Sequence, residues 1–151
     1  MTPALHACPQ FWSDIKETRK GASQKALFET SLSEEQFISS DIESKLDSIV
    51  ILRAISTLIQ NTFDEPEQAA NQLDRQPFIE HGFTIYKLRY AADGKGKSAG
   101  LRIMYCLGKD RTIIFLCIKF KNAVEDEAKF ESETIWRMKE FLKPNGAQDN
   151  N

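Results

Sequence analysis

The chain has 151 residues, of which 41% are hydrophobic and 28% charged, and its formal net charge is −2. These values suit one globular domain with a single core. No run of 18 apolar residues exists, which excludes a predicted membrane-spanning helix. The first residues, MTPALHACPQFW, lack a basic start followed by an apolar stretch, so we expect no secretory signal and a cytoplasmic location.

The N-terminal part of the chain predicts little regular structure. Residues 1–10 contain two prolines and no clear period, and we expect them to be extended or disordered. The segment FWSDIKETRK (11–20) has apolar residues at helical spacing with charges opposite, which predicts a short amphipathic helix. Ser33 and Gln36 form a weak capping box for another short helix. We interpret residues 1–40 as a partly helical N-terminal extension.

A long helix is predicted next. Ser40 and Glu43 form a capping box that opens IESKLDSIVILRAISTLIQNTF (42–63), where isoleucines and leucines recur at helical intervals. We expect its apolar stripe to pack on a sheet. Pro66 can occupy the first turn of a further helix over EPEQAANQLD, which ends before Pro77.

Three runs rich in β-branched and aromatic residues follow, at 83–90, 100–107 and 112–120. A Gly-rich tract separates the first two, and the short turn GKDR (108–111) separates the last two. This pattern predicts three consecutive antiparallel strands.

The chain closes with a predicted helix that Asn122 caps, with Glu125 three residues on. Residues 144–151 form a polar tail that we expect to be disordered. Residues 41–143 therefore predict an α+β domain, in which N-terminal helices pack on an antiparallel three- to four-stranded sheet and a C-terminal helix closes the structure. The expected apolar seam of that last helix comprises Val124, Ala128, Ile135, Met138 and Leu142.

The three cysteines, Cys8, Cys106 and Cys117, have no metal-ligand spacing, and two of them lie inside predicted strands. Such a sparse, odd set indicates a reducing compartment. The only histidines are His6 and His81. We therefore expect neither a metal site nor a cofactor.

Positive charge is concentrated in residues 83–122, which hold nine Lys or Arg and two acids, a balance of +7. In the strands the cations alternate with period two, at Lys87 and Arg89 and at Lys119 and Lys121, so they line one face of the sheet. A cationic sheet face attracts polyanions, and nucleic acid is the commonest large polyanion in a cell. The alternative is the solvated polar face of a half-buried sheet.

The tract DGKGKSAG (93–100) superficially matches a phosphate-binding loop. The Walker pattern requires a helix after its Lys-Ser pair, whereas a predicted strand follows here. We therefore exclude a P-loop fold that binds nucleoside triphosphates. The glycines instead give a loop that can bring its backbone amides and the ammonium groups of Lys95 and Lys97 close to phosphate.

The run GKGKSAGLRIMYCLGKDRTIIFLCIKFKN resembles the sheet of the RelE-like toxins of type II toxin–antitoxin systems, and among them the HigB branch. The typical run of that branch is G-[RK]-G-K-S-G-G-x-R-[VI]-x-Y, followed by an apolar strand and a K-N pair. The preceding FTIYKLRYA is similar to the family's strand that carries an R-[LVI]-R element. The resemblance covers residues 78–142 well and the earlier helices more loosely.

The resemblance implies a RelE-like fold and a metal-independent, ribosome-dependent endoribonuclease that cleaves mRNA and is neutralised by a cognate antitoxin. Cleavage by attack of a 2′-hydroxyl on the adjacent phosphate requires deprotonation of that hydroxyl, stabilisation of the phosphorane and protonation of the 5′-oxygen. By analogy, Arg102 would bind the transition-state phosphate, while Lys97 and Lys95 would hold the backbone, one of them serving as base. The residues expected to bind RNA are Arg89, Lys87, Lys119 and Lys121.

Each of these residues also has a simpler interpretation. The aliphatic stem of Arg102 can cover apolar surface on a strand. Lys95 and Lys97 can be solubilising residues of a turn, and Lys119 and Lys121 can be solvent-facing sheet cations.

A second class of function stays open. RelE-like toxins often supply a Tyr or His near the C-terminal end as acid or base, and this chain has neither after Tyr105. Its first 82 residues hold seven Lys or Arg and 13 acids, so an acidic half could cover the basic sheet or dock a partner. The alternative is a catalytically inactive RelE-fold module that binds a protein partner or nucleic acid. We expect no membrane partner in either case.

Overall fold

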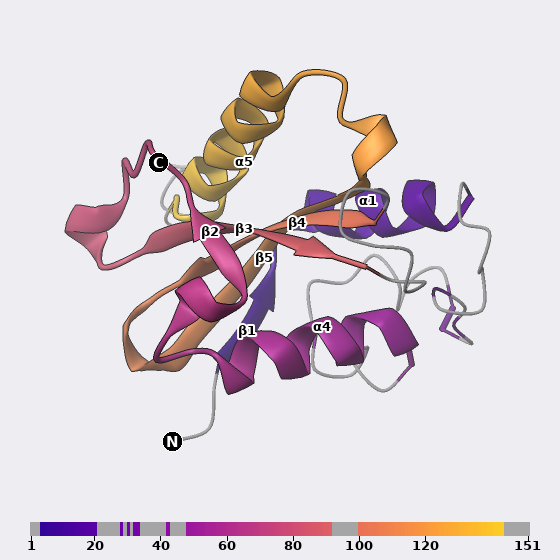
Figure 1. Cartoon of the computed structure of the whole chain (residues 1–151), viewed down its shortest axis with the longest axis horizontal. Helices are drawn as coiled ribbons and strands as arrows, with labels where there is room; N and C mark the ends of the chain where they lie inside the picture. The colour runs from indigo at the N-terminus through magenta and orange to yellow at the C-terminus, as the bar shows by residue number, and fades with distance from the viewer. Residues whose placement is uncertain are drawn as a thin grey trace.

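The structure is a computed structural model that describes residues 4–20, 28, 30, 32–33, 42, 48–91 and 100–143. Within these ranges it contains a five-stranded sheet, in the order β1-β5-β4-β3-β2, and three α-helices. Figure 1 shows α4 on one face of the sheet and α5 on the other. The expected α+β class is confirmed.

The meander predicted from the β-branched and aromatic runs is present. Its strands are β3 (Thr84–Tyr90), β4 (Leu101–Leu107) and β5 (Thr112–Phe120), and each pairs antiparallel with the next. A tight turn joins β4 to β5, where Asp110 and Arg111 adopt φ angles of 58° and 60°. Asp tolerates this left-handed region better than most residues, which suits it to such a turn.

The sheet is mixed, so the expectation of a purely antiparallel three- to four-stranded sheet is wrong. β1 (Ala4–Ala7) pairs in parallel with β5, with Ala4 opposite Thr112 and Ala7 opposite Phe115. A segment of four residues, two of them alanine, is too short to show the alternation of apolar and polar residues that predicts a strand. Their pairing joins segments that lie more than 100 residues apart, so local sequence could not predict it.

The helix expected from Pro66 is also wrong. Pro66–Gln68 forms a single 3₁₀ turn, and the chain then enters β2 (Ala70–Gln72), which pairs antiparallel with β3. The side-chain amide of Gln76 extends this edge, because it accepts from the Ile85 backbone N–H and donates to the Ile85 carbonyl, both at 2.9 Å. Sheet pairing here overrides the helical propensity of Ala and Gln.

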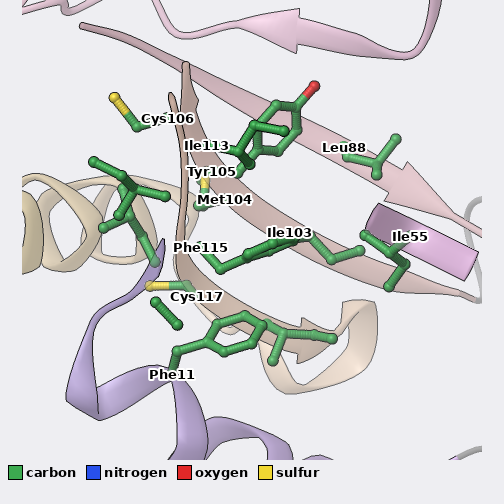
Figure 2. Close-up of a cluster of buried hydrophobic side chains, with 14 of the residues drawn as sticks. Phe11, Ile55, Leu88, Ile103, Met104, Tyr105, Cys106, Ile113, Phe115 and Cys117 are labelled. Atoms are coloured by element: carbon green, nitrogen blue, oxygen red, sulfur yellow. The ribbon is translucent and has the colours of Figure 1, made fainter. Parts of the chain in front are cut away.

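α4 (Val50–Asn61) begins later than the sequence predicts. Ile49 is its N-cap with extended backbone angles, and Ile42 is buried outside any helix. The predicted cap residues Ser40 and Glu43 lie outside the described residues, as do Gln36 and the expected domain boundary at residue 40. The buried stripe of α4 packs on the sheet, and Figure 2 shows its Ile55 in one cluster with Leu88 and Ile103.

α5 (Glu127–Phe141) is capped by Asp126, whose carboxylate accepts from the Lys129 backbone N–H at 3.2 Å. The cap predicted at Asn122 is wrong, because Lys121–Ala123 forms a 3₁₀ turn. The seam is only partly as expected: Met138 is buried and Ala128 is exposed. The buried face of α5 also includes a threonine and an arginine, which an apolar period does not count. The tail after residue 143 lies outside the described residues.

α1 (Pro9–Lys20) is predicted correctly. It covers the part of the β5 edge beyond residue 115, which the four residues of β1 do not reach. The Asp14 carboxylate accepts from the Ile118 backbone N–H at 3.1 Å, and the Thr18 hydroxyl donates to the Ile118 carbonyl at 3.4 Å. Side chains of α1 therefore satisfy strand groups that would otherwise be left buried and unpaired.

A buried ion pair joins α1 to α5 at the same edge. The Arg137 guanidinium donates to Asp14 at 2.7 and 3.2 Å and to the Leu116 carbonyl at 2.7 Å. Burial lowers the pKa of Arg137, but its bonds to Asp14 and Glu133 outweigh burial and raise the pKa above its usual value. Two helices and one strand are thus held through a single guanidinium.

The segment at residues 4–20 shares its core with the rest of the described chain. Phe11 of α1 lies 5.4 Å from Phe115 of β5, measured between ring centroids, and Figure 2 places both in one buried cluster. Among the described residues, no helix has the length and apolar character needed to cross a bilayer.

The buried ion pair gives a stability prediction. Asp14→Ala leaves the Arg137 guanidinium buried without its main partner, so we expect a loss of about 3–5 kcal/mol in the free energy of unfolding. Urea denaturation measures it. Glu17→Ala on the same helix removes an exposed partner of Lys20 and should change that free energy by no more than about 0.5 kcal/mol. Equal losses in the two variants would contradict this account.

Candidate nucleic-acid interface

Three cations lie in one row across the sheet. Arg89 of β3 is directly opposite Arg102 of β4, and Arg102 is directly opposite Lys119 of β5. Directly opposite residues in antiparallel strands point to the same face, with Cβ atoms roughly 5 Å apart. We call Arg89, Arg102 and Lys119 the basic row.

Lys87 lies on the same face, two residues before Arg89 on β3. Its ammonium group contacts two carboxylates of α5, Glu127 at 3.0 Å and Glu131 at 3.8 Å. Its side chain is 13% exposed, so it lies largely under α5. The first turns of α5 therefore cover one side of the basic row.

The centre of the row is the most buried of its members. Arg102 is 4% exposed, whereas Arg89 is exposed and Lys119 is half-buried. Burial lowers the pKa of Arg102, the neighbouring Arg89 lowers it further, and Glu127 partly offsets both. Like charges directly opposite on a sheet destabilise it. Perturbed pKa values cluster at functional sites, so Arg102 is a candidate for an anion-binding residue.

Two open cavities flank the row. One, of about 170 Å³, is lined by Lys87 and Arg89 together with Glu67 and Asn71 at the β2 edge. The other, of about 310 Å³, is lined by Lys119 with residues of α5 and of the turn before it. Lys119 itself lies 6.0 Å from the centre of the Phe130 ring. There is room at both ends of the row, and the cavity at the Lys119 end is also lined by the acids Glu125, Asp126 and Glu133.

The structure brings together four of the predicted site residues: Lys87, Arg89, Arg102 and Lys119 share one face, which we call the basic face. Lys121 was expected on the last strand, which is wrong because β5 ends at Phe120; Lys121 is exposed in the following turn.

Lys95 and Lys97 lie outside the described residues. The described ends of their loop, Ala91 and Gly100, lie next to the basic row. A Cβ at Gly100 would approach the Tyr90 carbonyl oxygen to 2.0 Å, so only glycine fits at this end of the loop. The loop therefore leaves and rejoins the sheet beside Arg89 and Arg102.

Two tyrosines and two cysteines of the meander are too buried for proton transfer at the row. Tyr86 and Tyr105 lie opposite each other on the α4 side of the sheet, with ring centroids 5.8 Å apart, and burial is the main cause of their raised pKa values. Burial also raises the pKa values of Cys106 and Cys117 to about 12. These groups stay protonated at neutral pH.

Sequence reasoning missed the acidic partners of the basic face. Glu127 and Glu131 are four residues apart, so they lie on one side of a helix, and this spacing is visible in the sequence. What the sequence did not indicate is that this side of α5 faces Lys87, because the predicted seam had the helix rotated.

Among the described residues, no cluster of His, Cys, Asp or Glu side chains is arranged to hold a metal ion. Comparison with known protein families, with curated proteins and with solved structures finds no match to this chain.

Burial of the cysteines gives a prediction about pH. Because the folded state raises the pKa values of Cys106 and Cys117 from 9.0 to about 12, it favours the neutral thiols, and their contribution to stability should fall as the pH rises from 9 toward 12. At pH 8 we expect no reaction of Cys8, Cys106 or Cys117 with a thiol reagent in the native protein, and full reaction in urea. A thiol that reacts in the native state at the rate of a free cysteine would contradict the described burial.

Proposed function

We propose that this protein binds a single-stranded segment of RNA on the face of the sheet that carries the basic row. The observation that carries the proposal is the register of Arg89, Arg102 and Lys119, which places three like charges side by side with the central one buried. A bound polyanion relieves the repulsion that this arrangement creates.

The dimensions of the row support a chain of phosphates as the ligand. Neighbouring strands lie roughly 4.8 Å apart, so the row spans about 10 Å from Arg89 to Lys119. That length is about one screening length at physiological salt, so the three charges act together on a ligand. Arginine forks bind phosphate oxygens in two-point contacts, which favours Arg102 and Arg89 as the phosphate-binding residues.

The choice of RNA rests on the resemblance to the RelE-like toxins and their HigB branch, which act on mRNA at the ribosome. On the same basis we propose a cognate antitoxin as the protein partner. Such an antitoxin would compete for the basic row through its own acidic residues.

Cleavage of the bound RNA is the second proposed function. Its support is the buried position of Arg102 between two other cations, because fixed charges in a site with little water stabilise a developing phosphorane most strongly. Lys95 or Lys97 would then act as the base that removes the proton of the 2′-hydroxyl. The rival proposal, an inactive RNA-binding or partner-binding module, is supported by the burial of Tyr86 and Tyr105 on the other face.

Arg89→Ala tests binding, because Arg89 is exposed and its loss should leave the fold intact. We expect affinity for a short single-stranded RNA to fall about tenfold, and the slope of log affinity against log salt to decrease by about 0.7. Fluorescence anisotropy at several salt concentrations measures both. Lys109→Ala is the matched control, because it also removes one positive charge but lies at the opposite end of β4. Equal effects of the two variants would contradict binding at the row.

Arg102→Met tests the role of the central arginine. Because methionine keeps most of the apolar volume of this buried side chain, we expect the variant to fold, which thermal unfolding checks. RNA binding should be lost, and with it any cleavage of a translated message in a primer-extension assay. A marked loss of stability with unchanged RNA binding would assign Arg102 a structural role. Wild-type binding without cleavage would favour the inactive module.

A further inference from the structure

Two carboxylates of the chain itself already lie on the basic face. Glu127 and Glu131 occupy successive turns of α5, and both contact the Lys87 ammonium. The charge of Glu127 also acts on Arg102. Both acids therefore lie against a cation of the basic face, Lys87, where a polyanion on that face would place an anionic group.

These contacts are weak enough to be exchanged. The side chain of Glu127 is 53% exposed and that of Glu131 is 33% exposed, so water competes for both carboxylates, whereas Lys87 is only 13% exposed and needs another anion in their place. The cavity lined by Lys87 and Arg89 opens beside the lysine that both acids contact. A glutamate side chain can swing into solvent there by changing rotamer.

The helix that carries them is fixed by other groups. Phe130, Thr134 and Met138 of α5 are buried, and Arg137 is bonded to Asp14 and to the strand. Displacement of the two carboxylates therefore needs no unfolding of α5.

We propose that Glu127 and Glu131 occupy the phosphate positions of the basic face in the free protein, and that a ligand carrying two adjacent phosphate groups binds by displacing them. The proposal rests on the proposed RNA site but specifies its competitor and its ligand class. The two acids lower the affinity of the site for every polyanion, so only ligands that can displace both of them bind tightly. A ligand with a single phosphate can replace only one of them.

The double variant Glu127→Gln/Glu131→Gln removes this competition while keeping the size of both side chains. We expect it to bind a 12-nucleotide single-stranded RNA, and inorganic tripolyphosphate, about fivefold to tenfold more tightly than the wild type. The affinity of the double variant for inorganic monophosphate should increase less. Glu80→Gln/Glu140→Gln is the matched control, because it removes two acids that contact no member of the basic face. Thermal unfolding establishes that both variants fold, and the two single variants serve if the double variant does not.

The outcomes separate the two proposals. If binding of RNA depends on Arg89 but the double variant binds no more tightly than its control, the displacement is overturned and the RNA site stands. If RNA binds equally to the wild type and to Arg89→Ala, the RNA site fails, and a selective gain in tripolyphosphate affinity would still support the displacement. Binding of neither probe to any variant overturns both.

Discussion

The antiparallel register of β3, β4 and β5 is the constraint on which the candidate site depends. Side chains alternate between the faces of a strand, so a slip of one residue would move Arg102 into the α4 side of the core and separate it from Arg89 and Lys119. The irregularity between Met104 and Tyr105 lies beyond the row and leaves its pairing intact. Apolar residues on the α4 face fix the register, and the cations on the other face are aligned as a consequence.

The second constraint is that side chains of α1 and α5 form hydrogen bonds with backbone groups of β5 that no described strand pairs. Asp14 and Arg137 join α1, β5 and α5, so the segment near the N-terminus determines where the last helix lies. That position brings Glu127 and Glu131 to Lys87. The anchor is buried and strong, whereas the contacts over the basic face are partly exposed and weak. One helix thus combines a fixed half with acids that can be exchanged for a ligand.

Local pattern predicted the meander, α1 and the shared face of Lys87 and Arg89, because strand and helix periods are properties of neighbouring residues. It did not predict β1, whose partner lies more than 100 residues away. It also did not predict β2, a segment whose sequence favours a helix but which pairs with β3. It also missed the rotation of α5, because the face that packs on β5 contains Thr134 and Arg137 and is not purely apolar. Alternation within each strand predicted that these cations lie on one face. Which cation is directly opposite which depends on the pairing of the strands, and the sequence did not predict it.

The most direct test of the central claim is a titration of the isotope-labelled protein with short single-stranded RNA, observed through the arginine Nε–Hε signals. We expect the signals of Arg89 and Arg102 to shift together and to saturate at one affinity, while the signal of Arg53, on α4 across the sheet, does not shift. Shifts of Arg53 alone, or equal small shifts of all arginines, would contradict a polyanion site on the basic row.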